Sequence, residues 1–237
     1  MTNKVNSLYI IATPIGNLED ITLRALRVLG EVDLILCEDT RVTKKLLAKY
    51  DIDTSTMSYH ANSAVSKTEK VIALLQEGKN IALVSDAGTP TISDPGSFLV
   101  KEVREKLVDT VAVVAIPGAS AVVSALSVSG LPASEFLFLG FLPHKKGRET
   151  LFKKIEESKR TVVFYESPHR ILKTLESLKI HLGVGHLSER KVVVARELTK
   201  IHEEIVSGTA DEVLVYFQNN NEKVRGEFVV MVSQLRT

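Results

Sequence analysis

The sequence has a single cysteine, no tryptophan and almost no net charge, and each shortage excludes a class of protein. With Cys37 alone, no disulfide can form within the chain and no cysteine-based zinc site is possible. The six histidines show no close metal-ligand spacing, and no His-Glu-x-x-His motif occurs. We therefore expect no bound metal and a reducing compartment, the cytoplasm.

Long apolar runs and an excess of one charge are also missing. No run approaches the ~20 apolar residues of a membrane-spanning helix, and the polar start at 1–7 precedes only a short apolar run. We expect neither a membrane segment nor a secretory leader. Lysine and arginine number 30 against 29 acidic residues, so any contact with nucleic acid must come from a local patch.

The common nucleotide-binding and hydrolase motifs are absent. There is no Gly-x-Gly-x-x-Gly after a strand, no Gly-x-x-x-x-Gly-Lys-Ser/Thr and no Gly-x-Ser-x-Gly. What remains is a chain of 237 residues, 44% of them hydrophobic, which is enough for one large domain or two small ones.

The most informative stretch present is 80–96. A short apolar run at 81–84 reads as a buried strand, and two turns rich in glycine and proline follow it before a helical pattern begins at Ser97. Asp94 before Pro95 has the pattern of a helix N-cap. Ligands of α/β sheets bind at the carboxyl ends of strands, so this stretch predicts a binding loop. A plain capped turn without a ligand fits the same residues.

Strands and helices alternate through the first half, which predicts a parallel, doubly wound sheet. We expect its strands at 8–12, 34–37, 57–59, 81–84 and 111–116 and its helices at 21–29, 42–50, 66–77 and 97–108. Asn17 or Asp20 would cap the first helix, and Ser66 with Glu69 would form a capping box.

The second half has shorter elements and predicts a mixed α/β unit with some antiparallel pairing. We expect helices at 121–128, 149–157, 171–178 and 209–217 and strands at 136–141, 161–165, 191–196, 202–206 and 228–232. Thr209 and Glu212 form a second predicted capping box, and a loop is expected at 181–188. The segment after Ile116 is the predicted boundary, giving domains 1–116 and 117–237.

Several predicted strands end in loops that carry carboxylates, hydroxyls and small residues. These loops are 13–17, 38–41, 59–62, 85–96, 117–120 and 166–170. In a protein of two α/β units such loops can face one cleft. The residue types suit a polar organic ligand held by backbone and carboxylate contacts.

Seven ordered motifs give the sequence a specific resemblance. They are Thr-Pro-Ile-Gly-Asn-Leu-Glu-Asp-Ile-Thr (13–22), Cys-Glu-Asp-Thr-Arg (37–41), Ser-Asp-Ala-Gly-Thr-Pro-x-Ile-Ser-Asp-Pro-Gly (85–96), Pro-Gly-Ala-Ser-Ala (117–121), Gly-Phe-Leu-Pro (140–143), Phe-Tyr-Glu-Ser-Pro-His-Arg (164–170) and Ala-Arg-Glu-Leu-Thr-Lys (195–200). Together they resemble the ribosomal RNA cytidine-2′-O-methyltransferases of the tetrapyrrole-methylase family. The resemblance implies two α/β domains of the class III methyltransferase type, with S-adenosyl-methionine (AdoMet) in the cleft between them, and a homodimer.

The resemblance also implies residues that hold the cofactor. They are Pro14, Asp86, Ala87, Gly88, Ile92, Ser120, Ala121, Glu166 and Leu198. A carboxylate can bind an ammonium group or ribose hydroxyls, and small residues admit backbone groups. In the alternative interpretation Ile92 and Leu198 are core residues and Ser120 is a helix cap.

Asp39, Arg41 and His60 are the candidate catalytic residues: Asp39 or Arg41 at the mouth of the expected cleft, touching the nucleotide, and His60 as the candidate general base. Acids at a helix start also favour the helix dipole, Arg41 could form a surface ion pair, and His60 could be a structural histidine. The sequence does not single out a base that removes the hydroxyl proton.

The candidate RNA-binding residues are the strongest local basic set: Lys145, Lys146, Arg148, His169 and Arg170. A solvated helix face is the alternative. The expected substrate is a cytidine of 16S ribosomal RNA within the 30S subunit. Methylation of a small tetrapyrrole-like ring and a non-catalytic role in ribosome assembly or AdoMet sensing are the competing functions. Many relatives continue past the last strand into a helical segment, and with the sequence ending at Thr237 we expect isolated RNA to be held weakly.

Overall fold

The computed structural model of the chain describes residues 6–60, 64–183 and 190–235 and divides it into two units, 1–120 and 121–237. Three features discussed above lie wholly or partly outside the described residues: Asn62 of the loop 59–62, positions 184–188 of the loop expected at 181–188, and most of the polar start. Within the described ranges, no helix has the length and apolar character needed to cross a membrane.

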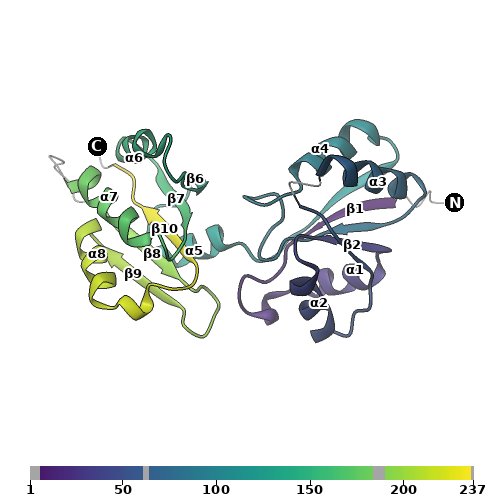
Figure 1. Cartoon of the computed structure of the whole chain (residues 1–237), viewed down its shortest axis with the longest axis horizontal. Helices are drawn as coiled ribbons and strands as arrows, with labels where there is room; N and C mark the ends of the chain where they lie inside the picture. The colour runs from purple at the N-terminus through teal and green to yellow at the C-terminus, as the bar shows by residue number, and fades with distance from the viewer. Residues whose placement is uncertain (1–5, 61–63, 184–189, 236–237) are drawn as a thin grey trace. The chain divides into compact units, whose positions relative to one another are not determined.

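Unit 1 is a parallel five-stranded sheet in the order β3-β2-β4-β1-β5, with helices on both faces (Figure 1). Its elements are β1 (Asn6–Ile11), η1 (Leu18–Asp20), α1 (Leu23–Glu31), β2 (Leu34–Cys37), α2 (Thr40–Lys49), β3 (Thr56–Ser58), α3 (Ala64–Gln76), β4 (Ile81–Leu83), α4 (Ser97–Lys106) and β5 (Val111–Ile116). The predicted parallel sheet is confirmed.

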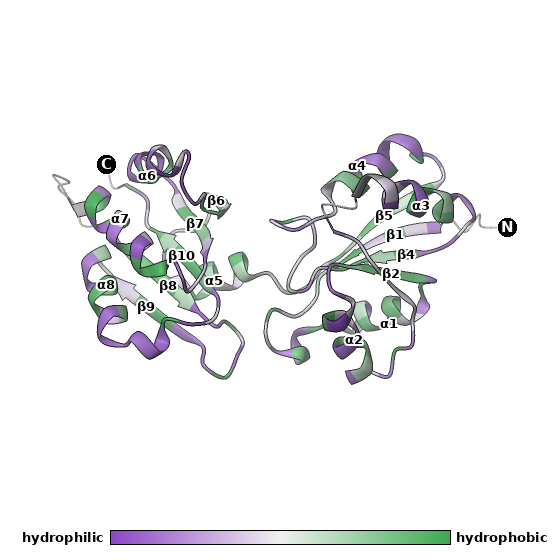
Figure 2. Cartoon of the chain, in the orientation of Figure 1, coloured by the Kyte–Doolittle hydropathy of each residue, from purple (hydrophilic) through white to green (hydrophobic). Residues whose placement is uncertain are grey.

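Two apolar layers enclose this sheet because its strands alternate their side chains between the faces. One layer joins α1 and α2 to strand residues such as Ile11, Ile35 and Ala82. The other joins α3 and α4 to strand residues such as Leu8 and Leu36. Figure 2 shows the corresponding concentration of hydrophobic residues along β2 and β4. Burial on both faces leaves the strand ends as the place for polar groups.

Unit 2 is a mixed five-stranded sheet in the order β6-β7-β10-β8-β9. Its elements are α5 (Ala121–Ser129), β6 (Phe136–Phe141), α6 (Arg148–Glu156), β7 (Thr161–Glu166), α7 (Ile171–Gly183), β8 (Val192–Arg196), β9 (Glu204–Gly208), α8 (Ala210–Asn219), η3 (Asn221–Lys223) and β10 (Phe228–Val232). β6 and β7 are parallel, and the other neighbours are antiparallel. The expected antiparallel pairing of the strands at 191–196 and 202–206 is confirmed as β8 and β9.

The core of unit 2 lies between the sheet and the helices α6, α7 and α8. Phe152 and Phe217 enter it from the helices, and Phe164, Val194 and Val230 enter it from the strands. The predicted capping box of α8 is confirmed: the Thr209 hydroxyl accepts from the amide of Glu212, and the Glu212 carboxylate accepts from the amide of Thr209. This cap stabilises a helix that covers the sheet.

The N-terminal caps of three helices differ from the sequence prediction. Thr22, not Asn17 or Asp20, caps α1, because the short η1 turn intervenes and Asn17 caps that turn. α3 already begins at Ala64, so Ser66 lies inside it. Asp94 is not the N-cap of α4: the helix starts after Gly96, whose φ is 126°.

Candidate active site

The loops that follow β1 and β4 are joined at the carboxyl edge of the sheet of unit 1. Thr13 and Gly88 exchange two backbone hydrogen bonds, with N···O distances of 2.9 and 3.0 Å. The Thr13 hydroxyl donates to the Ser85 carbonyl at 3.0 Å, and the Ser85 hydroxyl donates to the Gly88 carbonyl at 3.1 Å. Gly88 has a φ of 85°, a conformation that residues with a side chain rarely adopt. These contacts hold Pro14 and the 85–88 loop against each other.

The 85–96 loop continues with an unusual backbone. Thr91 and Ser93 have φ values of 74° and 64° although neither is glycine. Such conformations cost free energy and persist only where the surroundings impose them, which is frequent at functional sites. The predicted cofactor residue Ile92 stands between them with 46% of its surface exposed, so it is not part of the core.

Three carboxylates gather where β2 and β4 end. The backbone amide of Asp39 donates to Asp86 Oδ1 at 3.0 Å, which joins the two loops. Burial raises the pKa of Glu38, and the charges of Asp94 and Asp86 raise it further. Burial likewise raises the pKa of Asp94, against the effect of a hydrogen bond with Ser85. The repulsion within this carboxylate cluster (Glu38, Asp86 and Asp94) would be relieved by a cationic ligand.

Asp39 and Arg41 form a closed pair at the start of α2. Asp39 caps the helix by accepting from the amide of Arg41 at 2.8 Å, and the Arg41 guanidinium contacts both of its carboxylate oxygens. These hydrogen bonds with the side chain and backbone of Arg41 lower the pKa of Asp39 to about 2. Both side chains are therefore charged near neutral pH. The exposed His60 follows β3, with Nδ1 3.3 Å from the Glu38 carbonyl oxygen.

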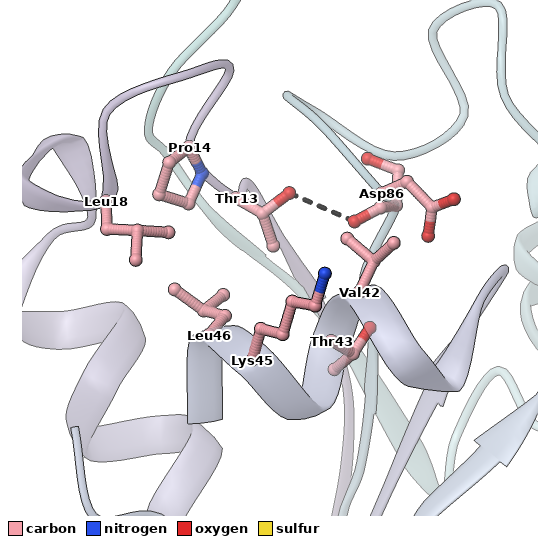
Figure 3. Close-up of a pocket in the computed structure, with 9 residues that line it drawn as sticks. Thr13, Pro14, Leu18, Val42, Thr43, Lys45, Leu46 and Asp86 are labelled. Carbon is pink, nitrogen blue, oxygen red and sulfur yellow. Dashed lines mark hydrogen bonds between the residues drawn. The ribbon is translucent and has the colours of Figure 1, made fainter. Parts of the chain in front are cut away.

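A pocket of about 210 Å³ opens at the same edge of unit 1, and Figure 3 shows most of its lining. Its lining residues are Thr13, Pro14, Leu18, Val42, Thr43, Lys45, Leu46, Ser85 and Asp86. Pro14 and Asp86 were predicted as cofactor residues. The others were not predicted as cofactor residues, although Thr13 and Ser85 belong to the predicted loops 13–17 and 85–96. The wall formed by α2 becomes recognisable only once β2 is known to lie beside β4.

The other predicted cofactor residues do not line this pocket. Ser120 ends unit 1 and Ala121 begins α5, both partly exposed. Leu198 is buried in the turn between β8 and β9, flanked by Glu197 and Thr199, whose φ values are 52° and 65°. Ala87 is exposed beside Asp86.

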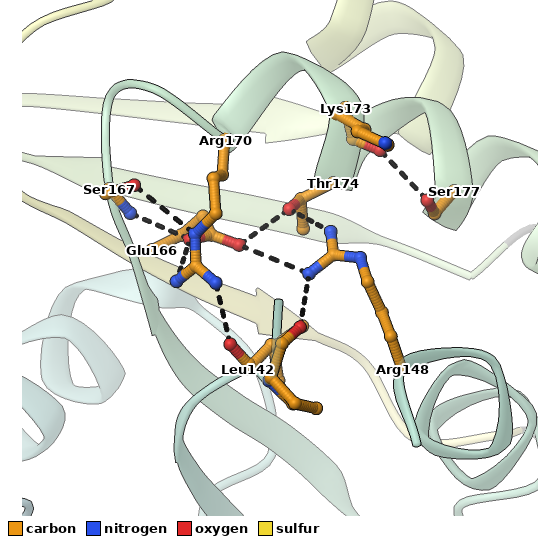
Figure 4. A network of polar contacts seen from close by, with 9 residues as sticks. Leu142, Arg148, Glu166, Ser167, Arg170, Lys173, Thr174 and Ser177 are labelled. Carbon is orange, nitrogen blue, oxygen red and sulfur yellow. Dashed lines mark hydrogen bonds and ion pairs between the residues drawn. The ribbon is translucent and has the colours of Figure 1, made fainter. Parts of the chain in front are cut away.

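Glu166 stands at the end of β7, and its carboxylate is fully buried. Arg170 contacts Oε1 at 2.7 Å, and the Thr174 hydroxyl donates to Oε2 at 2.6 Å (Figure 4). Arg148 lies 3.9 Å from Oε2. Of the five predicted RNA-binding residues, two, Arg148 and Arg170, are thus drawn toward this carboxylate, whereas Lys145, Lys146 and His169 are exposed. In the described parts of the chain, no group of three or more His, Cys, Asp or Glu residues is arranged to hold a metal ion.

Comparison with known proteins agrees with this architecture. The sequence profile of the family described as Tetrapyrrole (Corrin/Porphyrin) Methylases matches residues 7–214. A crystal structure of diphthine synthase superposes with a TM-score of 0.72, covering 96% of this chain and 90% of the other, at 13% identity. That likeness concerns the fold alone.

Several relatives with high sequence identity carry the same name. Ribosomal RNA small subunit methyltransferase I of Thermotoga maritima is 45% identical, over 97% of this chain and 99% of the relative. The protein of the same name from Escherichia coli O157:H7 is 48% identical, over 97% of this chain and 78% of the relative. The resemblance inferred from the seven motifs is confirmed. The chain belongs to the tetrapyrrole methylases and, within them, to the family of ribosomal RNA small subunit methyltransferase I.

Proposed function

We propose that the chain catalyses the AdoMet-dependent 2′-O-methylation of a cytidine ribose in the decoding region of 16S ribosomal RNA. One observation carries this proposal: proteins named ribosomal RNA small subunit methyltransferase I are 45% and 48% identical to the chain over 97% of its length. Membership of the methylase family supports the reaction class. The name of the relatives supports the substrate.

The carboxyl edge of unit 1 is suited to AdoMet. When bound, this cofactor supplies a methyl group on a positively charged sulfur, and it also carries an ammonium group. The carboxylate cluster, in which Glu38 and Asp94 have raised pKa values, favours such positive charges. Pro14 and the loop from Asp86 to Gly88 would border the cofactor, with Ile92 close by in sequence. Ser120, Ala121 and Leu198 stay predictions as cofactor contacts, and so does Glu166, through its backbone, because its carboxylate is fully buried.

Positioning is the first requirement of the reaction, because methyl transfer needs the ribose oxygen in line with the methyl group. Asp39 is a weak base with a pKa of about 2, so we assign Asp39 and Arg41 to orienting the nucleotide. We assign removal of the hydroxyl proton to His60. If its Nδ1 donates to the Glu38 carbonyl, the lone pair resides on Nε2.

RNA phosphates would meet the exposed loop between β6 and α6. Lys145 and Lys146 lie in it with exposed side chains, and His169 is exposed at the start of α7. Contacts of this kind release counterions and make binding dependent on salt. The near-neutral net charge of the chain is no obstacle, because a local patch suffices.

The proposed substrate is the assembled 30S subunit, and the proposed state of the enzyme is a cytoplasmic homodimer. With five tyrosines, eight phenylalanines and no tryptophan, the chain has few platforms for stacking free bases. Shape recognition of a folded particle would then select the ribose, and a dimer would offer a second docking surface.

The test is to incubate the protein with labelled AdoMet and either 30S subunits, naked 16S RNA, a short oligonucleotide of the target sequence or a tetrapyrrole precursor. We expect label on one cytidine 2′-oxygen of the 30S subunit and little on the oligonucleotide. Label on the tetrapyrrole alone would replace the proposal by small-molecule methylation. Equal kcat/KM on 30S subunits and oligonucleotide would contradict particle recognition.

A further inference from the structure

The buried carboxylate of Glu166 is saturated by partners from its own unit. Oε1 accepts from the Ser167 amide at 2.8 Å and pairs with Arg170 at 2.7 Å. Oε2 accepts from the Thr174 hydroxyl at 2.6 Å and faces Arg148 at 3.9 Å. Since 0% of this side chain is exposed, the carboxylate acts through the groups it holds.

Both arginines also donate hydrogen bonds to one short loop. Arg170 Nη1 donates to the carbonyl of Leu142 at 2.7 Å, and Arg148 Nη1 donates to the carbonyl of Pro143 at 3.3 Å. Arg148 Nη2 donates to the Thr174 hydroxyl at 2.7 Å. Figure 4 shows the two guanidinium groups on either side of the carboxylate. The side chain of Arg148 is 12% exposed and that of Arg170 is 16% exposed, so little of either side chain is accessible to a ligand.

The loop held in this way carries the exposed lysines. It follows β6, begins with the anchored residues Leu142 and Pro143, and continues through His144 to Lys145 and Lys146. The amide of Arg148 closes a turn on the carbonyl of Lys145 at 3.2 Å. The loop is thus tied down at its start by two carbonyl contacts and at its end by Arg148 itself.

We propose that Glu166 is a positioning residue for RNA binding, which acts through Arg148 and Arg170 to hold the loop 142–147 and present Lys145 and Lys146 to phosphates. The proposal rests on the proposed function for its ligand. Arg148 and Arg170, predicted from the sequence to bind RNA, instead fix the loop, and Lys145 and Lys146 contact the RNA.

The effect of Glu166→Gln separates this role from simple electrostatics. Removing a negative charge near bound RNA would, by charge alone, strengthen binding. If Glu166 positions the loop, Glu166→Gln weakens binding and lowers the magnitude of the log Kd–log salt slope by up to about 1.4, at ~0.7 for each of two lysine contacts. Unchanged or tighter binding of 16S RNA by Glu166→Gln overturns the proposal.

Combining variants shows whether Arg170 contacts RNA directly. The effect of Arg170→Ala is measured once in the wild type and once in a protein that already carries Lys145→Ala and Lys146→Ala. Residues that act through the same contacts give non-additive effects. We expect Arg170→Ala to lower the slope in the wild type and to change nothing further without the lysines. An additional fall of about 0.7 would mean a direct phosphate contact and would overturn the positioning role.

Hydrogen exchange of the free protein provides a readout independent of RNA. We expect faster exchange of amides in 142–148 in Glu166→Gln, and the same in Arg170→Lys, whose single ammonium cannot replace the planar fork of arginine. Glu204→Gln is the matched control, because Glu204 also joins ion pairs in unit 2, with Lys223 and Arg196. Unchanged exchange in 142–148 overturns the anchor. A wild type that binds no RNA defeats the proposed function, while the exchange result still decides the anchor.

Discussion

Gly88 offers a direct test of the cofactor loop, with Gly78 as its matched control. Both glycines have positive φ, 85° at Gly88 and 87° at Gly78. Gly88 joins the end of β1 through Thr13, at the carboxyl edge of the sheet. Gly78 precedes β4 at the opposite edge. Substituting each by alanine imposes the same backbone penalty at two ends of one strand.

The size of that penalty follows from the backbone. A left-handed conformation costs a residue with a side chain about 1–2 kcal/mol. At Gly78 a Cβ would meet nothing within 4 Å, and at Gly88 it would meet Ile15 Cγ2 at 3.4 Å, an ordinary contact. Both variants should therefore lose similar stability, and for a chain of this size the melting temperature should fall by ~2–8 °C. If the loop in Gly88→Ala shifts to relieve this strain, part of the free energy of AdoMet binding is used to restore the loop conformation.

The binding assay separates the two variants. Restoring the loop against 1–2 kcal/mol should weaken AdoMet binding by about 5- to 30-fold in Gly88→Ala and leave Gly78→Ala unchanged. Calorimetric titration with AdoMet gives the dissociation constants, and thermal unfolding without ligand gives the stabilities. Equal AdoMet affinity in the two variants would refute the placement of the cofactor at the 85–88 loop. A loss of stability in only one of them would refute the strain argument.

Three further perturbations test other parts of the molecule. Burial raises the pKa of Glu38 above its ordinary value of 4.5 and that of Asp94 above 3.8, so the folded state holds these protons more tightly than the unfolded state. The free energy of unfolding therefore falls as pH rises from these ordinary values to the raised ones. Binding of cationic AdoMet should release these protons, and its affinity should rise with pH just above the ordinary values. Calorimetric titration in buffers of different ionisation enthalpy would count the released protons. If no protons are released, the carboxylate cluster is not the cation site. His60→Gln should lower kcat by about 10²–10⁴ with AdoMet affinity unchanged, and a smaller effect would remove it as the base. Thr209→Ala should cost about 1 kcal/mol of stability by loss of the α8 cap, measurable by denaturant unfolding, and should spare methylation.

The sequence was a reliable guide to the elements themselves. Apolar runs at 34–37 and 228–232 became strands with the predicted bounds, because a strand buried on both faces leaves an uninterrupted run. The run at 111–116 also has the predicted bounds, although it forms an edge strand that is only partly buried. The capping residues of the helices were less predictable, since several residues near each start can cap. At α4 the aspartate at 94 is drawn toward Ser85, and the chain reaches the helix through a glycine with positive φ instead.

The candidate site was predictable only as separate loops. Glu38 and Asp94 are far apart in the sequence, and the charge of Asp94 raises the pKa of Glu38 because β2 and β4 are neighbours. Strand order depends on tertiary packing, which local patterns do not encode. Tertiary packing also determines which of the predicted RNA-binding residues remain exposed. Arg170 is four residues after Glu166, but the approach of Arg148 to that carboxylate needs the pairing of β6 with β7.

Cys37, the only thiol of the chain, lies fully buried in the core of unit 1 at the end of β2. Burial raises its pKa, so both solvent access and thiolate formation are suppressed in the folded state. A thiol-specific reagent therefore reacts only when unit 1 opens. The labelling rate measures the free energy of that opening without interference from unit 2, where the sequence has no cysteine. Slower labelling on addition of AdoMet would report cofactor binding to the opening unit with no engineered probe.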